Sequence, residues 1–129
     1  MNRRTLSVAI AGAVASLWLG ACSLPGSHLP PAESSGAGDP GRGKQLIGQY
    51  GCGSCHVVPG VRKANGLVGP PLTSFGRRSY IAGEIPNNAD NLQHWVADPQ
   101  SIEPGTVMPD LGVSAVDARD IAAYLLSLG

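Results

Sequence analysis

Three observations predict that this chain forms an all-α domain with long loops. Apolar residues recur at helical spacing near the start, in the middle and at the end of region 39–129. No stretch of that region alternates apolar and polar residues as a half-buried strand does. Turns rich in Pro and Gly separate the helical segments and leave loops longer than most compact domains contain. We therefore expect three to four helices connected by long loops.

The first helix is expected to begin after Asp39 and to run to about Tyr50. Asp39 is a good N-cap residue, and Pro40 suits the first helical position. Leu46 and Ile47 form its apolar side together with Tyr50, and Gly51 ends it.

A loop is expected from 57 to 72, followed by a short helix at about 73–77 and a loop containing Tyr80 and Ile81. The next helix should span about 89–97, with Asn87 or Asn88 as its cap and Asp98-Pro99 as its stop.

The last helix has the clearest signals. Ser114 is its predicted N-cap, and Asp117 three residues later resembles the second member of a capping box. Ile121, Leu125 and Leu128 then form an apolar stripe at positions i, i+4 and i+7.

The N-terminal region predicts export. Arg3 and Arg4 precede an apolar run at 6–19 that is too short to span a bilayer comfortably, as in a secretory signal. Leu19-Gly20-Ala21-Cys22 resembles the lipobox of bacterial lipoproteins, which predicts a signal peptide at 1–21 and an acylated Cys22. Ordinary cleavage that leaves Cys22 as a free thiol, and retention of an uncleaved anchor, are the alternatives.

Residues 22–38 are rich in Pro, Ser and Gly and are expected to form a flexible tether between the acylated Cys22 and a domain at 39–129. The predicted location is the periplasmic face of a membrane, with the protein held there by its lipid anchor.

Cys52-Gly53-Ser54-Cys55-His56 has the spacing of a covalent attachment site for haem c. The two thiols bond to the two vinyl groups of one haem, and the adjacent imidazole becomes an iron ligand. A thioredoxin-like dithiol would need a βαβ context, a zinc site would need two more ligands, and a Cys52–Cys55 disulfide would close only a very small loop. A buried haem also explains how long loops can surround a small core.

Met108 is the predicted second axial ligand beside His56. It is the only Met that remains after signal cleavage, and it lies in an apolar loop followed by Pro109. The alternatives are that Met108 only fills the core and that His94 is the ligand. Two bound ligands favour a single-electron carrier that is not itself an enzyme, whereas an open position would favour a gas sensor or a peroxidase.

Region 39–129 resembles a class I cytochrome c over its whole length. The matching stretches occur in the family's order, and they are Gly43-Lys44, Cys52 to His56, Gly69-Pro70-Pro71-Leu72, Asn91-Leu92 with Trp95, Pro104-Gly105-Thr106 before Met108, and Ile121 to Leu125. The resemblance implies a class I fold in which the first and last helices cross around one covalent haem.

The same resemblance implies roles for individual residues. Gly43 would allow the first helix to approach the last one near Tyr124 and Leu125. The Pro70 carbonyl would accept a hydrogen bond from His56, and Trp95 would pack on the haem and donate to a propionate. Two further residues, Arg77 and Tyr80, are implied as partners of Met108 or of the propionates.

The chain is particularly similar to the small c-type domains of bacterial respiratory chains, including those fused to oxidase subunits. Together with the predicted lipid anchor at Cys22, this similarity implies a membrane-tethered carrier between a quinol-oxidising complex or dehydrogenase and a terminal oxidase. The alternative is a haem subunit of a larger oxidase or dehydrogenase complex.

Charge predicts no nucleic-acid partner, because the nine basic and nine acidic residues balance. Basic residues concentrate in the first two-thirds of the domain and acidic residues in the last third. This distribution predicts either docking to a charged redox partner or two ordinary solvated faces.

Overall fold

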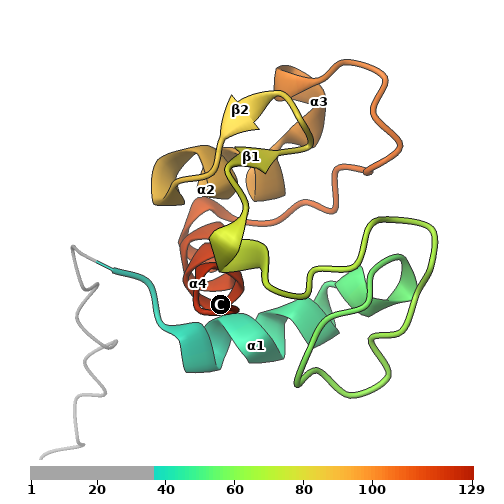
Figure 1. The fold of residues 1–129 in the computed structure, drawn as a ribbon, viewed down its shortest axis with the longest axis vertical. Coiled ribbons are helices and arrows are strands. Elements are labelled where there is room, and N and C mark those ends of the chain that lie inside the picture. Colours follow the sequence, from blue (N-terminus) through green and yellow to red (C-terminus); the bar gives the residue numbers. More distant parts are fainter. Residues whose placement is uncertain (1–36) are drawn as a thin grey trace, which may run out of the picture. The chain divides into compact units, whose positions relative to one another are not determined.

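The computed structural model describes residues 37–129, and four α-helices dominate that part of the chain (Figure 1). The predicted signal peptide at 1–21, the lipidation site Cys22 and nearly all of the tether lie outside the described residues. The elements are α1 (Pro40–Gln49), a 3₁₀ turn (Cys52–Ser54), a second 3₁₀ turn (Phe75–Arg77), β1 (Tyr80–Ile81), β2 (Ile85–Pro86), α2 (Ala89–Ala97), α3 (Pro99–Ile102) and α4 (Ala115–Leu126). No helix within 37–129 is long and apolar enough to cross a membrane.

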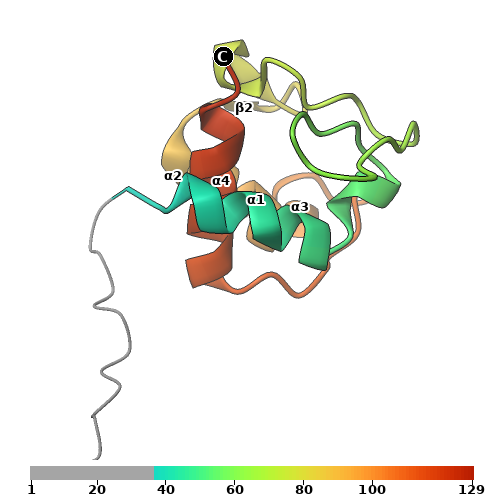
Figure 2. The same cartoon turned by 90° about the horizontal axis from the view of Figure 1, so that it is seen from below.

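Helix α1 crosses α4 in both views, as the resemblance implied (Figures 1 and 2). The crossing point is Gly43, where a Cβ atom would lie 1.9 Å from the carbonyl oxygen of Asp120. Gly43 thus allows the close approach that the resemblance implied, but α1 meets α4 at Asp120, one turn before Tyr124. Tyr124 instead donates a hydrogen bond of 2.5 Å to the Pro59 carbonyl.

Polar contacts reinforce the crossing of α1 and α4. Arg42 forms ion pairs with Asp117 and with Asp120, whose carboxylate also accepts from the Asp39 backbone N–H at 2.8 Å. The Tyr50 hydroxyl donates to Asp117 at 2.7 Å. The hydrogen bond from Tyr50, joined by those from Arg42 and Ser114, lowers the pKa of the Asp117 carboxyl. These contacts connect the two ends of the domain.

The caps of the main helices agree with the sequence. Asp39 caps α1, and Ser114 caps α4 by accepting from the Asp117 N–H at 3.2 Å. Of the two Asn residues considered for α2, Asn88 is the cap. The neighbouring Asn87 donates instead to the carbonyls of Phe75 and Arg78, at 3.0 Å each.

One short hairpin corrects the expectation that the domain has no strand. Tyr80 pairs with Pro86 and Ile81 with Ile85 in an antiparallel register. Ala82 and Gly83, with φ angles of 54° and 87°, form its tight turn. Strands of two residues are too short to produce a visible alternation, which is why the sequence predicted a loop at Tyr80-Ile81.

The structure also contains a helix that the sequence did not predict, α3, because Asp98-Pro99 both ends α2 and begins α3. The Asp98 side chain accepts from the Ser101 N–H at 3.1 Å, and Pro99 occupies the first helical position. Sequence patterns do not easily predict a helix of one turn.

The core forms where α4 packs against α1 and α2. Its buried side chains include Leu46, Ile47, Leu92, Trp95, Val96, Ala118, Ile121, Ala122 and Leu125. On one side of this core the long loops at 51–72 and 103–114 enclose the cavity described next.

Candidate functional site

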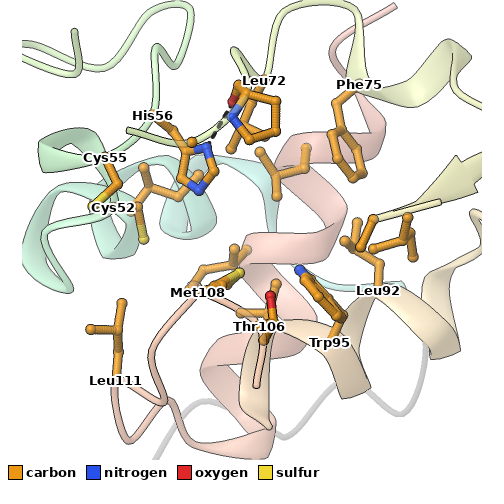
Figure 3. Close-up of a pocket in the computed structure, with 18 of the residues that line it drawn as sticks. Cys52, Cys55, His56, Leu72, Phe75, Leu92, Trp95, Thr106, Met108 and Leu111 are labelled. Carbon is orange, nitrogen blue, oxygen red and sulfur yellow. Dashed lines mark hydrogen bonds between the residues drawn. The ribbon is translucent and has the colours of Figure 1, made fainter. Parts of the chain in front are cut away.

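A cavity of about 300 Å³ is bordered by α1, α2, α4 and the long loops. Its size lies at the lower end of the roughly 300–1,000 Å³ typical of cofactor pockets. The lining is mainly apolar, and it includes every cofactor-binding residue predicted from the sequence, namely Cys52, Cys55, His56, Pro70, Trp95 and Met108 (Figure 3). The fold thus brings together residues that are up to 56 positions apart in the chain.

The backbone that follows α1 directs both thiols toward the cavity. Gly51 has a φ of 73°, which ends α1 and turns the chain into the 3₁₀ turn. The N–H groups of Cys55 and His56 then both donate to the Cys52 carbonyl, at 3.2 and 3.0 Å. This tight turn holds Cys52 and Cys55 on one side of the cavity, as Figure 3 shows.

The two thiols do not have the features of a redox dithiol. Burial raises the pKa of the Cys52 thiol, whereas reactive dithiols have a lowered pKa. Moreover, no group of three or more metal-ligating His, Cys, Asp or Glu side chains occurs within 37–129. These observations argue against the dithiol and zinc alternatives.

The imidazole of His56 is held by the loop at 69–71. Its Nδ1 lies 2.7 Å from the Pro70 carbonyl oxygen, the contact that the family resemblance implied. Because a carbonyl can only accept, Nδ1 carries the proton and Nε2 keeps a free lone pair. Gly69 lies directly against the ring, where a Cβ atom would be 2.3 Å from Cε1. The geometry therefore leaves Nε2 available as a metal ligand.

Met108 lies across the cavity from His56, and its sulfur is on the cavity side in Figure 3. The Gln100 side chain, which sequence analysis missed, holds this loop. Its amide nitrogen donates to the carbonyls of Thr106 and Met108, at 2.9 and 3.0 Å, and its oxygen accepts from the Gly105 N–H at 3.1 Å. Gln100 belongs to α3, so no sequence signal pointed to it.

His94 does not reach the cavity. It is exposed on α2, and its Nε2 lies 3.0 Å from the Ser101 hydroxyl. Trp95, the next residue, lines the cavity and is 8 % exposed. Its indole nitrogen faces the cavity in Figure 3. This geometry favours Met108 over His94 as the ligand opposite His56.

The roles that the resemblance implied for Arg77 and Tyr80 fit the position of Arg78 better. Neither of those two residues lines the cavity, and Tyr80 is 58 % exposed. Arg78 does line it, donates to the Pro71 carbonyl and stacks 5.0 Å from the centroid of the Phe75 ring. Of the two neighbouring arginines, only Arg78 lines the cavity.

The chemistry of this lining fits a haem. Apolar side chains suit the faces of the macrocycle, and two thiols on one side suit its vinyl groups. An imidazole nitrogen and a thioether are available for the iron, and Arg78 supplies the one fixed positive charge among the lining residues for the haem carboxylates.

Comparisons with known proteins agree with this assignment. The profile of the cytochrome c family matches residues 41–129. The chain is 42 % identical over 88 residues to cytochrome c oxidase subunit 2 of Alkalihalophilus pseudofirmus, and 34 % identical over 85 residues to that of Bacillus subtilis. These matches cover 67 % and 64 % of this chain, but only 25 % and 24 % of the oxidase subunits.

Another relative is of similar size to this chain. Cytochrome c-552 of Bradyrhizobium diazoefficiens is 32 % identical over 97 residues, which cover 75 % of this chain and 82 % of that protein. The family assignment implies one haem c, covalently bound, and the motif provides Cys52 and Cys55 to bind it. The chain therefore belongs to the class I branch of the cytochrome c family.

Proposed function

We propose that the protein is a membrane-tethered single-electron carrier of a respiratory chain, with His56 and Met108 as the two axial ligands. The observation that carries the proposal is the position of these two side chains on different loops facing one cavity. When bound, the haem supplies a one-electron couple. The protein side chains bind the haem, orient its ligands and exclude water from it.

The protein residues favour electron transfer over bond chemistry. The hydrogen bond to Pro70 fixes the orientation of His56, and Gln100 fixes the Met108 loop. A thioether ligand raises the reduction potential relative to a second imidazole. Among the residues that line the cavity, none is a carboxylate that could act as a general base. A site with two held ligands is suited to changing its oxidation state with little rearrangement.

The relatives support the respiratory assignment. Two of them are oxidase subunits that contain a domain similar to this one, so we infer that electrons leave this protein for a terminal oxidase. The donor would be a quinol-oxidising complex or a dehydrogenase. The similar size of cytochrome c-552 supports a separate carrier.

The tether is the second part of the proposal. The signal at 1–21 and the lipobox that ends at Cys22 support acylation and attachment at the periplasmic face of a membrane. The test is a Cys22→Ser variant expressed with its own signal sequence and fractionated beside the parent. The parent should sediment with membranes and the variant should be released as soluble holoprotein. A variant that remains in the membrane fraction would contradict lipid anchoring.

The alternative is a fixed haem subunit of a larger oxidase or dehydrogenase complex, which the oxidase-subunit relatives favour. Purification of the tagged full chain in mild detergent separates the two functions. Stoichiometric recovery of other subunits would favour the fixed subunit, whereas recovery of the monomeric haem protein alone would favour the shuttle.

A further inference from the structure

Two consecutive carbonyl groups in the loop that holds His56 accept hydrogen bonds from different side chains. The Pro70 carbonyl oxygen lies 2.7 Å from Nδ1 of His56, a bond drawn dashed in Figure 3. The Pro71 carbonyl accepts from the guanidinium of Arg78. Proline has no backbone N–H, so hydrogen bonds can hold these two residues only through their carbonyl oxygens. Both oxygens are used, and one short piece of backbone therefore connects Arg78 to His56.

Backbone hydrogen bonds fix the two ends of this loop but not its middle. The N–H groups of Gly69 and Leu72 donate to the backbone carbonyls of the residues on either side of His56, at 2.8 Å each. The two prolines between them are exposed, and exposed loop backbone opens more easily than packed elements. Within 37–129, the middle of the loop forms one hydrogen bond besides that of His56, and Arg78 donates it.

The side chain of Arg78 is itself held in one position. Its guanidinium stacks on the ring of Phe75, 5.0 Å from the centroid, and Phe75 is buried. Arg78 is half-buried and lines the cavity, whereas its neighbour Arg77 is exposed and does not. A flat guanidinium that rests on a buried ring directs its N–H donors to fixed positions. Arg78 can therefore restrain the carbonyl to which it donates.

Asn87 fixes the turn that carries Phe75 and Arg78. Its side-chain nitrogen donates to the carbonyls of both residues, at 3.0 Å each, and its backbone N–H donates to the Ser79 carbonyl at 2.9 Å. The Asn87 Oδ1 atom is buried and has no hydrogen-bond partner among the described residues. A buried acceptor without a partner lowers stability. The contribution of Asn87 therefore lies in the two bonds that its side chain donates to the turn.

We propose that Arg78 and Asn87 are positioning residues for the axial ligand His56. Asn87 holds the turn that carries Arg78, and Arg78 holds the Pro71 carbonyl. The adjacent carbonyl, which orients the imidazole, is held with it. The inference rests on the assignment of His56 as a ligand in the function proposed above. A firmly held acceptor keeps Nδ1–H bonded and Nε2 basic, which favours the oxidised iron. Loss of either positioning residue should therefore weaken the bond from His56 and raise the reduction potential.

NMR of the reduced holoprotein follows the hydrogen bond of His56 directly. The rate at which the Nδ1–H proton exchanges with solvent measures how firmly this bond is held. In Arg78→Ala and in Asn87→Ala we expect the rate to rise about tenfold, as for the loss of about one hydrogen bond. Redox titration should give a potential above that of the parent for both variants. Asn87→Ala retains the charge of Arg78, so faster exchange in that variant cannot come from a change in charge. It also tests the same path if Arg78→Ala yields no holoprotein.

Each variant has a matched control nearby in the chain. Arg77→Ala removes the same charge from the residue next to Arg78, which is exposed and does not line the cavity. Asn91→Ala removes a side-chain amide that donates to the Pro86 carbonyl at 2.9 Å, not to the turn. In both controls the Nδ1–H proton of His56 should exchange at the parent rate.

The exchange rates and the His56 ring signals separate two possible errors. Parent-like exchange in both Arg78→Ala and Asn87→Ala would overturn the proposal, and faster exchange in Arg78→Ala alone would overturn the role of Asn87. An imidazole bound to the iron has ring signals strongly displaced by the haem ring current. Undisplaced signals in the parent would mean that the ligand assignment is wrong. Displaced signals with unchanged exchange rates would mean that only the positioning role is wrong.

Discussion

The Nδ1 nitrogen of His56 lies 2.7 Å from the carbonyl oxygen of Pro70, fourteen residues later in the chain. This hydrogen bond selects the tautomer in which Nε2 is unprotonated and raises its basicity as a ligand. The backbone that provides the carbonyl is itself packed on the ring through Gly69. Ligand orientation is thus determined by a loop.

Gly69→Ala should disturb this arrangement. The added Cβ would lie 2.3 Å from Cε1 of His56, so either the ring or the loop must move. We expect a lower yield of holoprotein and, in what forms, a weakened His56 ligand field. Absorption and electron paramagnetic resonance spectra of the ferric protein measure this. Parent-like spectra would show that the loop is not the element that orients His56.

Met108→Ala should lower the reduction potential, because a thioether stabilises the reduced iron. The shift should be a substantial part of the roughly 0.8 V over which axial ligands tune haem potentials. His94→Ala is the control, since His94 is exposed and bonds to Ser101. Redox titration of both variants decides between the two residues, and a large shift in the His94 variant alone would reverse the assignment.

Gln100→Ala should loosen the Met108 loop without removing the ligand. Three hydrogen bonds to the loop backbone would be lost, at Thr106, Met108 and Gly105. We expect carbon monoxide to bind the reduced variant faster than it binds the parent. Gln93→Ala, on α2, removes a Gln side chain that has no hydrogen bond to this loop and should leave the rate unchanged. Equal rates for all three proteins would mean that Gln100 does not restrain Met108.

Gly43→Ala should destabilise the domain, because the new methyl group would overlap the Asp120 carbonyl and separate α1 from α4. Overpacking of this kind costs about 1–3 kcal/mol. Gly48→Ala is the matched control on the same helix, where a Cβ atom meets nothing within 4 Å. It should be neutral or stabilise the protein by up to about 1 kcal/mol. Denaturant unfolding of the two holoproteins measures the difference, and equal costs would contradict the close crossing.

The contact between Tyr50 and Asp117 should make stability fall in acid. The pKa of Asp117 is lowered in the folded state, chiefly by the hydrogen bond from Tyr50. Its stabilising contribution is therefore present above the unfolded pKa of about 4 and is lost as the pH falls through the lower folded value. Tyr50→Phe should reduce the acid slope of the unfolding free energy.

Tyr124→Phe is the control for that slope, because it removes a hydroxyl that donates to the Pro59 carbonyl and not to a carboxylate. It should lower stability by a similar amount at every pH in the acid range. An acid slope unchanged by Tyr50→Phe would contradict the role of the Tyr50–Asp117 contact.

The sequence predicted those features that depend on local chemistry. The caps Asp39 and Ser114, the helix at 89–97 and the haem motif were identified because each depends on residues a few positions apart. The sequence did not predict, or predicted at the wrong residue, those contacts that depend on how segments distant in the chain pack together. Gln100 forms hydrogen bonds to the Met108 loop because α3 places its side chain beside that loop. Gly43 contacts Asp120 because α1 and α4 cross at these two positions. Arg78 and Arg77 are equivalent in sequence, and only the turn at Phe75–Arg77 separates them.

The most direct test of a closed site between His56 and Met108 is the optical spectrum of the holoprotein, recorded oxidised and reduced and again after addition of carbon monoxide. If His56 and Met108 both bind the iron, the oxidised protein should have a low-spin spectrum with the far-red band of Met-to-iron ligation, and carbon monoxide should leave the reduced spectrum unchanged. Rapid carbon monoxide binding, or a missing far-red band, would mean that Met108 does not hold the iron. The site would then be suited to binding small ligands, and the assignment of a closed electron-transfer site would be wrong.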